Sequence, residues 1–305
     1  KYLIDTATAA VDELTVIVCG KTEHTISGEL RGAWLREIHP TVRVMVIDDI
    51  YDDNDSELWA RLTIGWLGYR PDVVFTSEDY GVPFSHFLGC RHVLVDKARL
   101  AVPCSGTMIR ERPLTHWQFL EPPVRAHFAL RVCVVGAESS GTTTLSQALA
   151  EHYQTVWVPE YGREYSETKL RGDSDPVWQT PEFVHIAVEQ CRREDAAARE
   201  ANKVLICDTN ALATRLWHER YMGFTAGEVD SVSAGRHYDL YLLTDVDIPF
   251  VQDGTRDGEH IRHDMHSRFV EELSSQGLPY ELLSGSHEQR LGRAIGLIDQ
   301  LLSQR

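Results

Sequence analysis

The chain has 305 residues, 43% of them hydrophobic, and a formal net charge of −16 at pH 7. Its length predicts about two domains, and its acidic balance argues against a nucleic-acid-binding surface, which is normally basic, without excluding nucleotide substrates. No apolar run approaches the length of a membrane span, and the six scattered cysteines, none in a C-x-x-C pair, indicate reduced core residues of a cytoplasmic protein.

Helices and strands alternate through the first part of the chain. The helical spacing of apolar residues predicts an amphipathic helix over 3–14, a second helix over 29–38, and a third that ends at about Tyr69. Apolar, β-branched runs predict strands at 14–19 and 42–47, within PDVVFTSEDYG (71–81), and at HVLVD (92–96). This alternation is typical of a parallel sheet that is covered by helices on both faces.

A domain boundary is expected in EPPVRA, residues 121–126, because two prolines there stop the preceding helix. The alternation then restarts. Strands are expected at 131–135, 155–158, 203–207, 239–243 and 279–283, and helices at 142–153, 181–202, 210–222, 226–235 and 265–275, before a closing helix through Leu291, Ile295, Ile298 and Leu302. The sequence thus predicts an α/β protein of two three-layer domains, residues 1–125 and 126–305.

The segment GAESSGTT, residues 136–143, has the layout of a phosphate-binding loop and is called the phosphate loop below. A β-branched strand ends in Gly136, and Gly141 precedes a helix, so that backbone amides can turn toward phosphate oxygens. In the pattern G-x-x-x-x-G-K-[ST], Thr143 holds the position whose hydroxyl binds Mg²⁺. Thr142 stands where that pattern has lysine, so the segment also fits an ordinary turn between a strand and a helix.

Polar residues follow later strands of the second half, at the sheet edge where ligands bind in parallel sheets. Asp208 ends VLICD and is expected to position Mg²⁺ or its water shell, or to cap the next helix. Glu160 is expected to act as a general base on a substrate hydroxyl, or to pair with Arg163. Arg256 and Arg262 lie in a polar segment after the fourth strand, where they would supply the charge missing from the phosphate loop or face solvent.

A second candidate anion site lies in CSGTMIR, residues 104–110, where a helix is expected to begin. Ser105 and Thr107 offer hydroxyl groups, and Arg110 offers a guanidinium one turn later. Amides, hydroxyls and charge together can hold a triphosphate. The same residues also fit a plain helix N-cap.

The order of these motifs resembles a known family. The S-x-T-x-I-R pattern of residues 105–110 is similar to the carboxyl-side motif of nicotinamide-mononucleotide adenylyltransferases. Together with PDVVFTSEDYG, HVLVD, VVGAESSGTTTL, EYGRE, ICDTN and DGTRD, it resembles the bifunctional NadR family across nearly the whole chain. Those proteins couple a Rossmann-like adenylyltransferase domain to a P-loop ribosylnicotinamide kinase domain.

The resemblance implies a two-step salvage path to NAD. The second domain would phosphorylate nicotinamide riboside with ATP and Mg²⁺, and the first would transfer an adenylyl group from ATP to nicotinamide mononucleotide, releasing pyrophosphate. The implied kinase residues are Gly136, Ser139, Ser140, Gly141, Thr142 and Thr143 at the ATP phosphates and Mg²⁺, Asp208 at the metal or substrate, Arg256 and Arg262 in a lid, Glu160 as base, and Tyr161, Arg163 and Thr209 at the riboside. The implied adenylyltransferase residues are Ser105, Thr107 and Arg110 at ATP, with Trp59, Ser77 and Glu78 near the nicotinamide.

Two departures from the family pattern qualify these expectations. Thr142 replaces the usual lysine, and the family's G-x-F-x-P-x-H-x-G-H segment, with its adenylyl-transfer histidines and the sheet's first strand, would lie just upstream of Lys1. We therefore expect the sequence to be incomplete at its N-terminus, and no segment represents a helix-turn-helix domain. A P-loop kinase of another small alcohol, a non-catalytic nucleotide-sensing module and a homo-oligomer all stay open, with no nucleic-acid or membrane partner expected.

Overall fold

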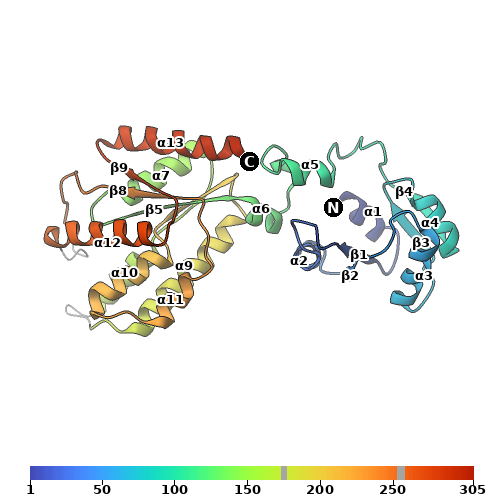
Figure 1. Ribbon diagram of the computed structural model, residues 1–305, viewed down its shortest axis with the longest axis horizontal. Coiled ribbons are helices and arrows are strands. Elements are labelled where there is room, and N and C mark those ends of the chain that lie inside the picture. The colour runs from blue at the N-terminus through green and yellow to red at the C-terminus, as the bar shows by residue number, and fades with distance from the viewer. Residues whose placement is uncertain (173–176, 253–257) are drawn as a thin grey trace. The chain divides into compact units, whose positions relative to one another are not determined.

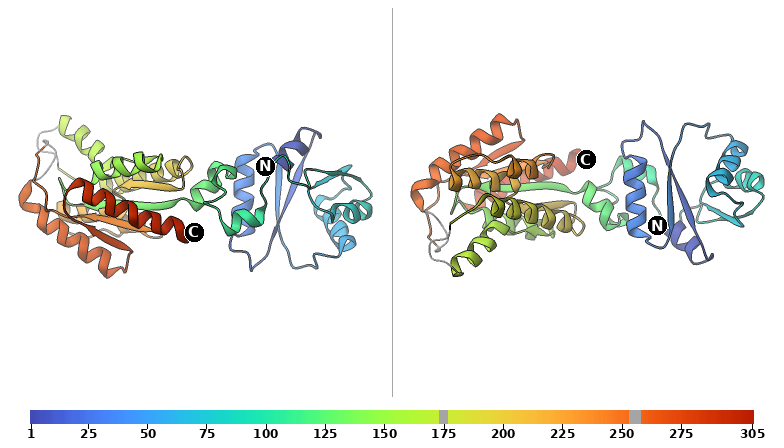
Figure 2. Two further views of the ribbon diagram at one scale, coloured as in Figure 1. Left: turned by 90° about the horizontal axis from the view of Figure 1, so that it is seen from above. Right: turned by 90° about the horizontal axis from the view of Figure 1, so that it is seen from below.

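The computed structural model describes residues 1–172, 177–252 and 258–305. Its elements fall into two compact units, Lys1–Glu111 and Arg112–Arg305 (Figure 1, Figure 2). The division comes earlier than the boundary expected at 125/126, because the intervening residues pack within the second unit. There Trp117 is buried, and its indole Nε1 donates to the carbonyl oxygen of Ala201 at 3.2 Å.

The two prolines of the expected boundary begin a helix and do not stop one. They occupy the first turn of α6 (Pro122–Phe128). Proline suits this place, since its fixed φ matches the helix and its missing N–H would have no intrahelical partner there. Only a short 3-10 turn, η1 (Trp117–Phe119), precedes it.

A five-stranded parallel sheet forms the core of the second unit, with the strand order β6-β7-β5-β8-β9. Its strands are β5 (Leu130–Gly136), β6 (Trp157–Val158), β7 (Val204–Asp208), β8 (Leu240–Thr244) and β9 (Tyr280–Leu283). Both β7 and β8 are buried along their whole length, as strands covered on both faces must be. The predicted parallel α/β arrangement is confirmed for this unit.

Helices cover both faces of this sheet. They are α7 (Thr142–Tyr153), α8 (Tyr161–Gly172), α9 (Thr180–Ala198), α10 (Ala211–Met222), α11 (Gly227–Ser233), α12 (Arg262–Ser275), which follows the turn η2 (Glu259–Ile261), and α13 (His287–Gln304). Figure 1 shows α7 and α13 on one face, with α9, α10 and α12 on the other. Among the described residues, no helix is long and apolar enough to cross a membrane.

The first unit contains two separate parallel strand pairs where one sheet was expected. Its elements are α1 (Tyr2–Thr8), β1 (Thr15–Gly20), α2 (Gly28–Ile38), β2 (Arg43–Asp48), α3 (Ser56–Leu67), β3 (Val73–Thr76), α4 (Gly81–Leu88), β4 (Arg91–Leu94) and α5 (Gly106–Glu111). A cavity of about 1460 Å³ is lined by α1, α3 and the two strands β1 and β3. These strands each have one hydrogen-bonded neighbour, so their other edges are open.

Besides α6, three helices differ from expectation. The first ends at Thr8 and does not continue to residue 14. The hydroxyls of Thr6 and Thr8 donate to the carbonyls of Tyr2 and Ile4 at 2.8 and 2.9 Å, and such bonds weaken a helix. The helices α4 and α8 occupy segments for which the sequence predicted no helix.

Candidate functional site

The phosphate loop joins β5 to α7 and is shaped so that its amides can face a ligand. A Cβ at Gly136 would lie 2.2 Å from Oγ1 of Thr244, so no side chain fits there. Ser139 and Gly141 have positive φ angles of 57° and 88°. Left-handed residues of this kind turn successive amides toward one side and create a cradle for anions.

Ser140 holds the loop in place and does not line the cavity. Its side chain is buried, and its hydroxyl donates to the carbonyl of Ala137 at 2.6 Å. The same hydroxyl shares a hydrogen bond of 2.7 Å with Oγ1 of Thr244 on β8. The sequence implied that Ser140 binds the ATP phosphates. Because its hydroxyl is bonded within the protein, only its backbone amide is available for that role.

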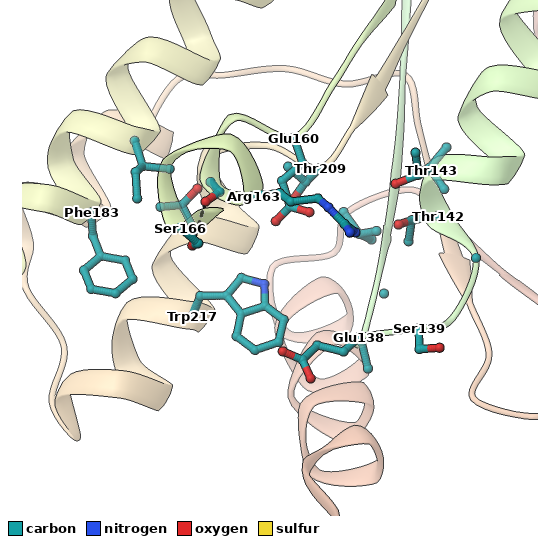
Figure 3. A pocket seen from close by; sticks show the side chains of 18 of the residues that line it. Glu138, Ser139, Thr142, Thr143, Glu160, Arg163, Ser166, Phe183, Thr209 and Trp217 are labelled. Atoms are coloured by element: carbon teal, nitrogen blue, oxygen red, sulfur yellow. Dashed lines mark hydrogen bonds between the residues drawn. The ribbon is translucent and has the colours of Figure 1, made fainter. Parts of the chain in front are cut away.

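A cavity of about 440 Å³ opens above the phosphate loop. Eight residues implied by the sequence line it: Gly136, Ser139, Gly141, Thr142, Thr143, Glu160, Arg163 and Thr209. Figure 3 shows Glu160, Arg163 and Thr209 facing the same space as Thr142 and Thr143. They meet because β6, β7 and β5 are consecutive in the sheet, and the residues after their carboxyl ends share one edge.

Asp208 lies at the base of this site. Only 2% of the residue is exposed, and its Oδ2 accepts a hydrogen bond of 2.6 Å from the Thr143 hydroxyl. Burial raises the pKa of Asp208 to about 6, although hydrogen bonds from Thr143 and Thr142 and the charge of Arg163 act in the opposite direction. A carboxylate in such surroundings favours a cation beside it.

Asp208 and Thr143 fit a magnesium ion. The second carboxylate oxygen, Oδ1, is buried and has no hydrogen-bond partner in the part of the chain that the structure describes. Mg²⁺ prefers oxygen ligands and often keeps water and phosphate oxygens with only one or two protein groups. The alternative role of Asp208 as a helix cap is wrong, because Asn210 caps α10 by accepting from the amide of Ala213 at 3.1 Å.

Arg163 is the only basic residue among the described residues that line the cavity. Its side chain is 41% exposed, and its Nε donates to Glu167 Oε1 at 3.1 Å. The side chain is therefore only partly covered by the protein. The role of Glu160 as a general base stays a prediction, and its place in the cavity wall is compatible with that role.

Tyr161 and Arg262, like Asp208, do not line the cavity. The Tyr161 hydroxyl bonds to Nε2 of His185 at 3.0 Å, and the Arg193 guanidinium lies 4.3 Å from the centre of the Tyr161 ring. Arg262 is buried against the backbone of the phosphate loop. Arg256 lies outside the described residues.

An aromatic wall that the sequence did not predict bounds the other side of the cavity. Its members are Trp178, Phe183, Trp217 and Tyr221. The ring centres of Trp178 lie 5.3 Å from Phe183 and 5.4 Å from Tyr221, and those of Trp217 and Tyr221 are 6.4 Å apart. Trp217 and Tyr221 stand four residues apart on α10, one helical turn, which is the signal that could have identified them.

The residues implied for the first unit are not brought to one cavity. Trp59 and Glu78 line the cavity of about 1460 Å³, and Ser77 is the residue after β3. Ser105, Thr107 and Arg110 do not line it.

The Ser105 hydroxyl accepts from the Met108 amide at 3.1 Å, which confirms the N-cap. Arg110 Nη2 donates to the Thr107 hydroxyl at 3.2 Å, so two of the three implied ATP ligands bond to each other.

Comparisons with known proteins show what the chain is similar to. A family model described as an AAA domain matches residues 131–290. The trifunctional NAD biosynthesis/regulator protein NadR of Escherichia coli (strain K12) is 30% identical over 331 residues, covering 100% of this chain and 80% of that protein. The protein of the same name from Salmonella typhimurium is 27% identical, with the same coverage.

Two solved structures share the fold. A NadR protein in complex with NAD and AMP-PNP superimposes with a TM-score of 0.78 at 21% identity, covering 98% of this chain and 91% of that chain. A NadR protein in complex with NR has a TM-score of 0.78 at 19% identity, covering 97% and 90%. From its full-length similarity to the Escherichia coli protein, this chain belongs to the NadR family.

Proposed function

We propose that the second unit is a ribosylnicotinamide kinase and that the first unit adenylates its product to NAD. The observation that carries the kinase proposal is that the residues implied for the ATP phosphates and for the riboside line the same cavity. It has a phosphate loop on one side, an aromatic wall on the other, and Glu160 in its lining (Figure 3). The NadR structures with NR and with NAD and AMP-PNP support the same assignment by similarity.

The aromatic wall suits a flat, positively charged ring. The nicotinamide of the riboside is a pyridinium, and aromatic faces attract cations by roughly 0.5–2 kcal/mol in each favourable contact. Trp217 faces the cavity (Figure 3), and Trp178 and Tyr221 also line it. An uncharged base would lose this attraction, so we expect the wall to favour nicotinamide riboside over ordinary nucleosides.

The chemistry follows from the positions of the lining groups. The 5′ hydroxyl of the riboside attacks the γ-phosphorus of ATP, the bond to the β–γ bridging oxygen breaks, and ADP leaves. Glu160 accepts the hydroxyl proton, while amides of the phosphate loop and Arg163 face the phosphates. Mg²⁺, held by Thr143 and Asp208, would neutralise charge on the β and γ phosphates.

A riboside panel with ATP and Mg²⁺ tests the kinase proposal. We expect phosphorylation of nicotinamide riboside to exceed that of adenosine, uridine and cytidine in kcat/KM. Turnover of another alcohol but not of nicotinamide riboside would instead favour a P-loop kinase of different specificity. ATP binding without phosphoryl transfer to any acceptor would favour the nucleotide-sensing module.

The proposal for the first unit rests on helix α5 and on the unpaired edges of strands β1 and β3. Residues 105–110 begin a helix with a capping serine and a nearby guanidinium, which is compatible with a triphosphate site. One further strand between β1 and β3 would convert the two pairs into one Rossmann-like sheet, and Trp59 and Glu78 would then lie beside it. The first unit is proposed as the nucleotidyltransferase domain on this basis.

Incubation of the protein with nicotinamide mononucleotide, ATP and Mg²⁺ tests this second activity. We expect NAD and pyrophosphate to form in equal amounts from protein that carries the G-x-F-x-P-x-H-x-G-H segment. Arg110→Ala should reduce that formation without changing riboside phosphorylation, because Arg110 belongs to the first unit alone. Equal loss of both activities would contradict the assignment of one activity to each unit.

A further inference from the structure

Two buried arginines hold the outer side of the phosphate loop. Arg262 begins α12 and is 3% exposed, and it donates from Nε to the Glu138 carbonyl at 3.1 Å and from Nη2 to the Ser139 carbonyl at 3.3 Å. Arg290 of α13 is 4% exposed and donates from Nη1 to the Ser140 carbonyl at 2.7 Å. Three successive carbonyls of the loop therefore accept hydrogen bonds from these two arginines. The arginines belong to helices on opposite faces of the sheet (Figure 1).

These bonds fix the direction of the loop amides. A peptide group whose carbonyl points outward to a guanidinium presents the following N–H to the other side, where the cavity lies. Ser139 has a φ of 57°, which costs a residue with a side chain some free energy. The two guanidinium groups offset that cost and keep the anion cradle formed before any ligand binds.

The two arginines differ in whether a carboxylate pairs with the positive charge. Arg290 forms an ion pair with Asp247, so its charge is compensated. The remaining hydrogen bonds of Arg262 go to the carbonyl of Ile248, both at 3.1 Å, and the Phe250 ring centre lies 5.7 Å from its guanidinium carbon. Within the described ranges, no carboxylate pairs with Arg262, so among those residues only backbone carbonyl oxygens accept from its buried guanidinium.

A buried cation without a counter-charge is costly, and an anion on the inner side of the same loop would relieve that cost. Thr142 provides only a hydroxyl at the place of the usual lysine. We propose that Arg262 supplies, through the backbone of the phosphate loop, the positive charge that a lysine at residue 142 would supply by contact. Arg262 is thus a positioning residue that raises affinity for the phosphates without touching them.

The proposal rests on phosphate binding by the kinase unit, and not on which alcohol is phosphorylated. Binding of ATP and of inorganic tripolyphosphate is therefore measured by calorimetry without riboside, at several salt concentrations. Arg262→Gln is expected to weaken both by about tenfold and to flatten the salt dependence, since one charge acts on the phosphates across a poorly solvated region. Adding Thr142→Lys to Arg262→Gln should restore most of the loss.

A matched control removes a loop hydrogen bond without changing net charge. The double variant Arg290→Gln with Asp247→Asn loses the bond to the Ser140 carbonyl together with a neutral ion pair. It should weaken tripolyphosphate binding less than Arg262→Gln does and should retain the salt dependence of the unmodified protein. An equal loss with the same salt profile in both variants would show that Arg262 acts only by holding the loop.

Thr142→Lys alone covers the case in which Arg262→Gln does not fold, as judged by circular dichroism. If Arg262 already supplies the charge, the new lysine should improve tripolyphosphate affinity by less than about threefold. An improvement of about 100-fold, which corresponds to a full unshielded contact, would overturn the proposal. Because neither measurement uses riboside, a failure of nicotinamide riboside as substrate would not be mistaken for a failure of this inference.

Discussion

The two units are alike in sequence pattern but differ in how their strands pair. In the second unit β5 lies at the centre, with β7 on one side and β8 on the other, and the pairs Cys133↔Cys207 and Gly136↔Thr244 fix the register. In the first unit β1 pairs only with β2 and β3 only with β4. The same alternation of helices and strands thus gives a continuous sheet in one unit and two open pairs in the other.

The difference shows what a continuous sheet does for a site. The phosphate loop after β5, Asp208 at the end of β7 and Thr244 at the end of β8 meet because these three strands are neighbours. In the first unit, Gly20 and Ser77 stand at the ends of strands that are not hydrogen-bonded to each other. The implied adenylyltransferase residues are correspondingly spread out.

Hydrogen exchange should give the largest contrast between the two units. Amides of β5 and β8 are expected to exchange at least about 10³-fold more slowly than those of β1 and β3, because the edges of β1 and β3 face a cavity and open locally. Mass spectrometry of deuterium uptake by peptides from each strand measures this. Similar protection in all four strands would mean that the β1 and β3 edges are covered in solution.

Glu160→Gln is expected to impair riboside phosphorylation by the second unit and to leave NAD formation by the first unit unchanged. Riboside phosphorylation should fall by about 10³-fold in kcat, since the variant keeps the shape of the side chain and loses the proton acceptor. Glu167→Gln is the matched control, because Glu167 bonds to Arg163 and does not line the cavity. A fall of less than about threefold for Glu160→Gln would remove it from the role of base.

The sequence predicted the second unit well for a physical reason. The strands β7 and β8 are buried along their whole length, so each is a largely apolar run that is visible without its neighbours. The phosphate loop and Asp208 were visible because glycines and a carboxylate must follow such strands at set places. Strand pairing in the first unit was not visible, since no strand there encodes which partner it has.

The missed features depend on contacts between distant segments. The helix α8 has few apolar residues and is held by ion pairs, such as that of Glu164 with Arg193 at 2.6 Å, so it shows no apolar stripe. In the aromatic wall, Trp178 precedes α9 and Trp217 lies on α10, and only the fold brings them to one cavity. Arg262 was expected in a lid and instead binds backbone carbonyls.

Asp208→Asn should stabilise the second unit while it abolishes phosphoryl transfer. The pKa of Asp208 is about 6 in the folded protein, above its ordinary value, so the charged carboxylate destabilises the fold. We expect the variant to raise the free energy of unfolding by up to about 3 kcal/mol at pH 8, where the carboxylate is charged in both states. The gain should shrink as the pH falls through 6 and vanish below about 4.

Denaturant unfolding with EDTA at a series of pH values measures this gain. Asp245→Asn is a control of opposite sign. Burial acts to raise the pKa of Asp245, but hydrogen bonds from Ser284 and Val246 lower it overall, so its carboxylate is stabilising at neutral pH. A difference between Asp208→Asn and the unmodified protein that does not change with pH would contradict the explanation by burial.

Trp217→Leu should have the smallest effect of these variants. It tests most directly whether the cavity of the second unit binds nicotinamide riboside. The leucine keeps the wall apolar and removes the aromatic face, so the KM for nicotinamide riboside should rise about tenfold while the KM for ATP stays the same. Dihydronicotinamide riboside, which is uncharged, should lose much less. Trp66→Leu makes the same change in the cavity of the first unit and should leave riboside phosphorylation unchanged. If both ribosides lose affinity equally in Trp217→Leu, the wall acts through contact area alone and not through the charge of the pyridinium.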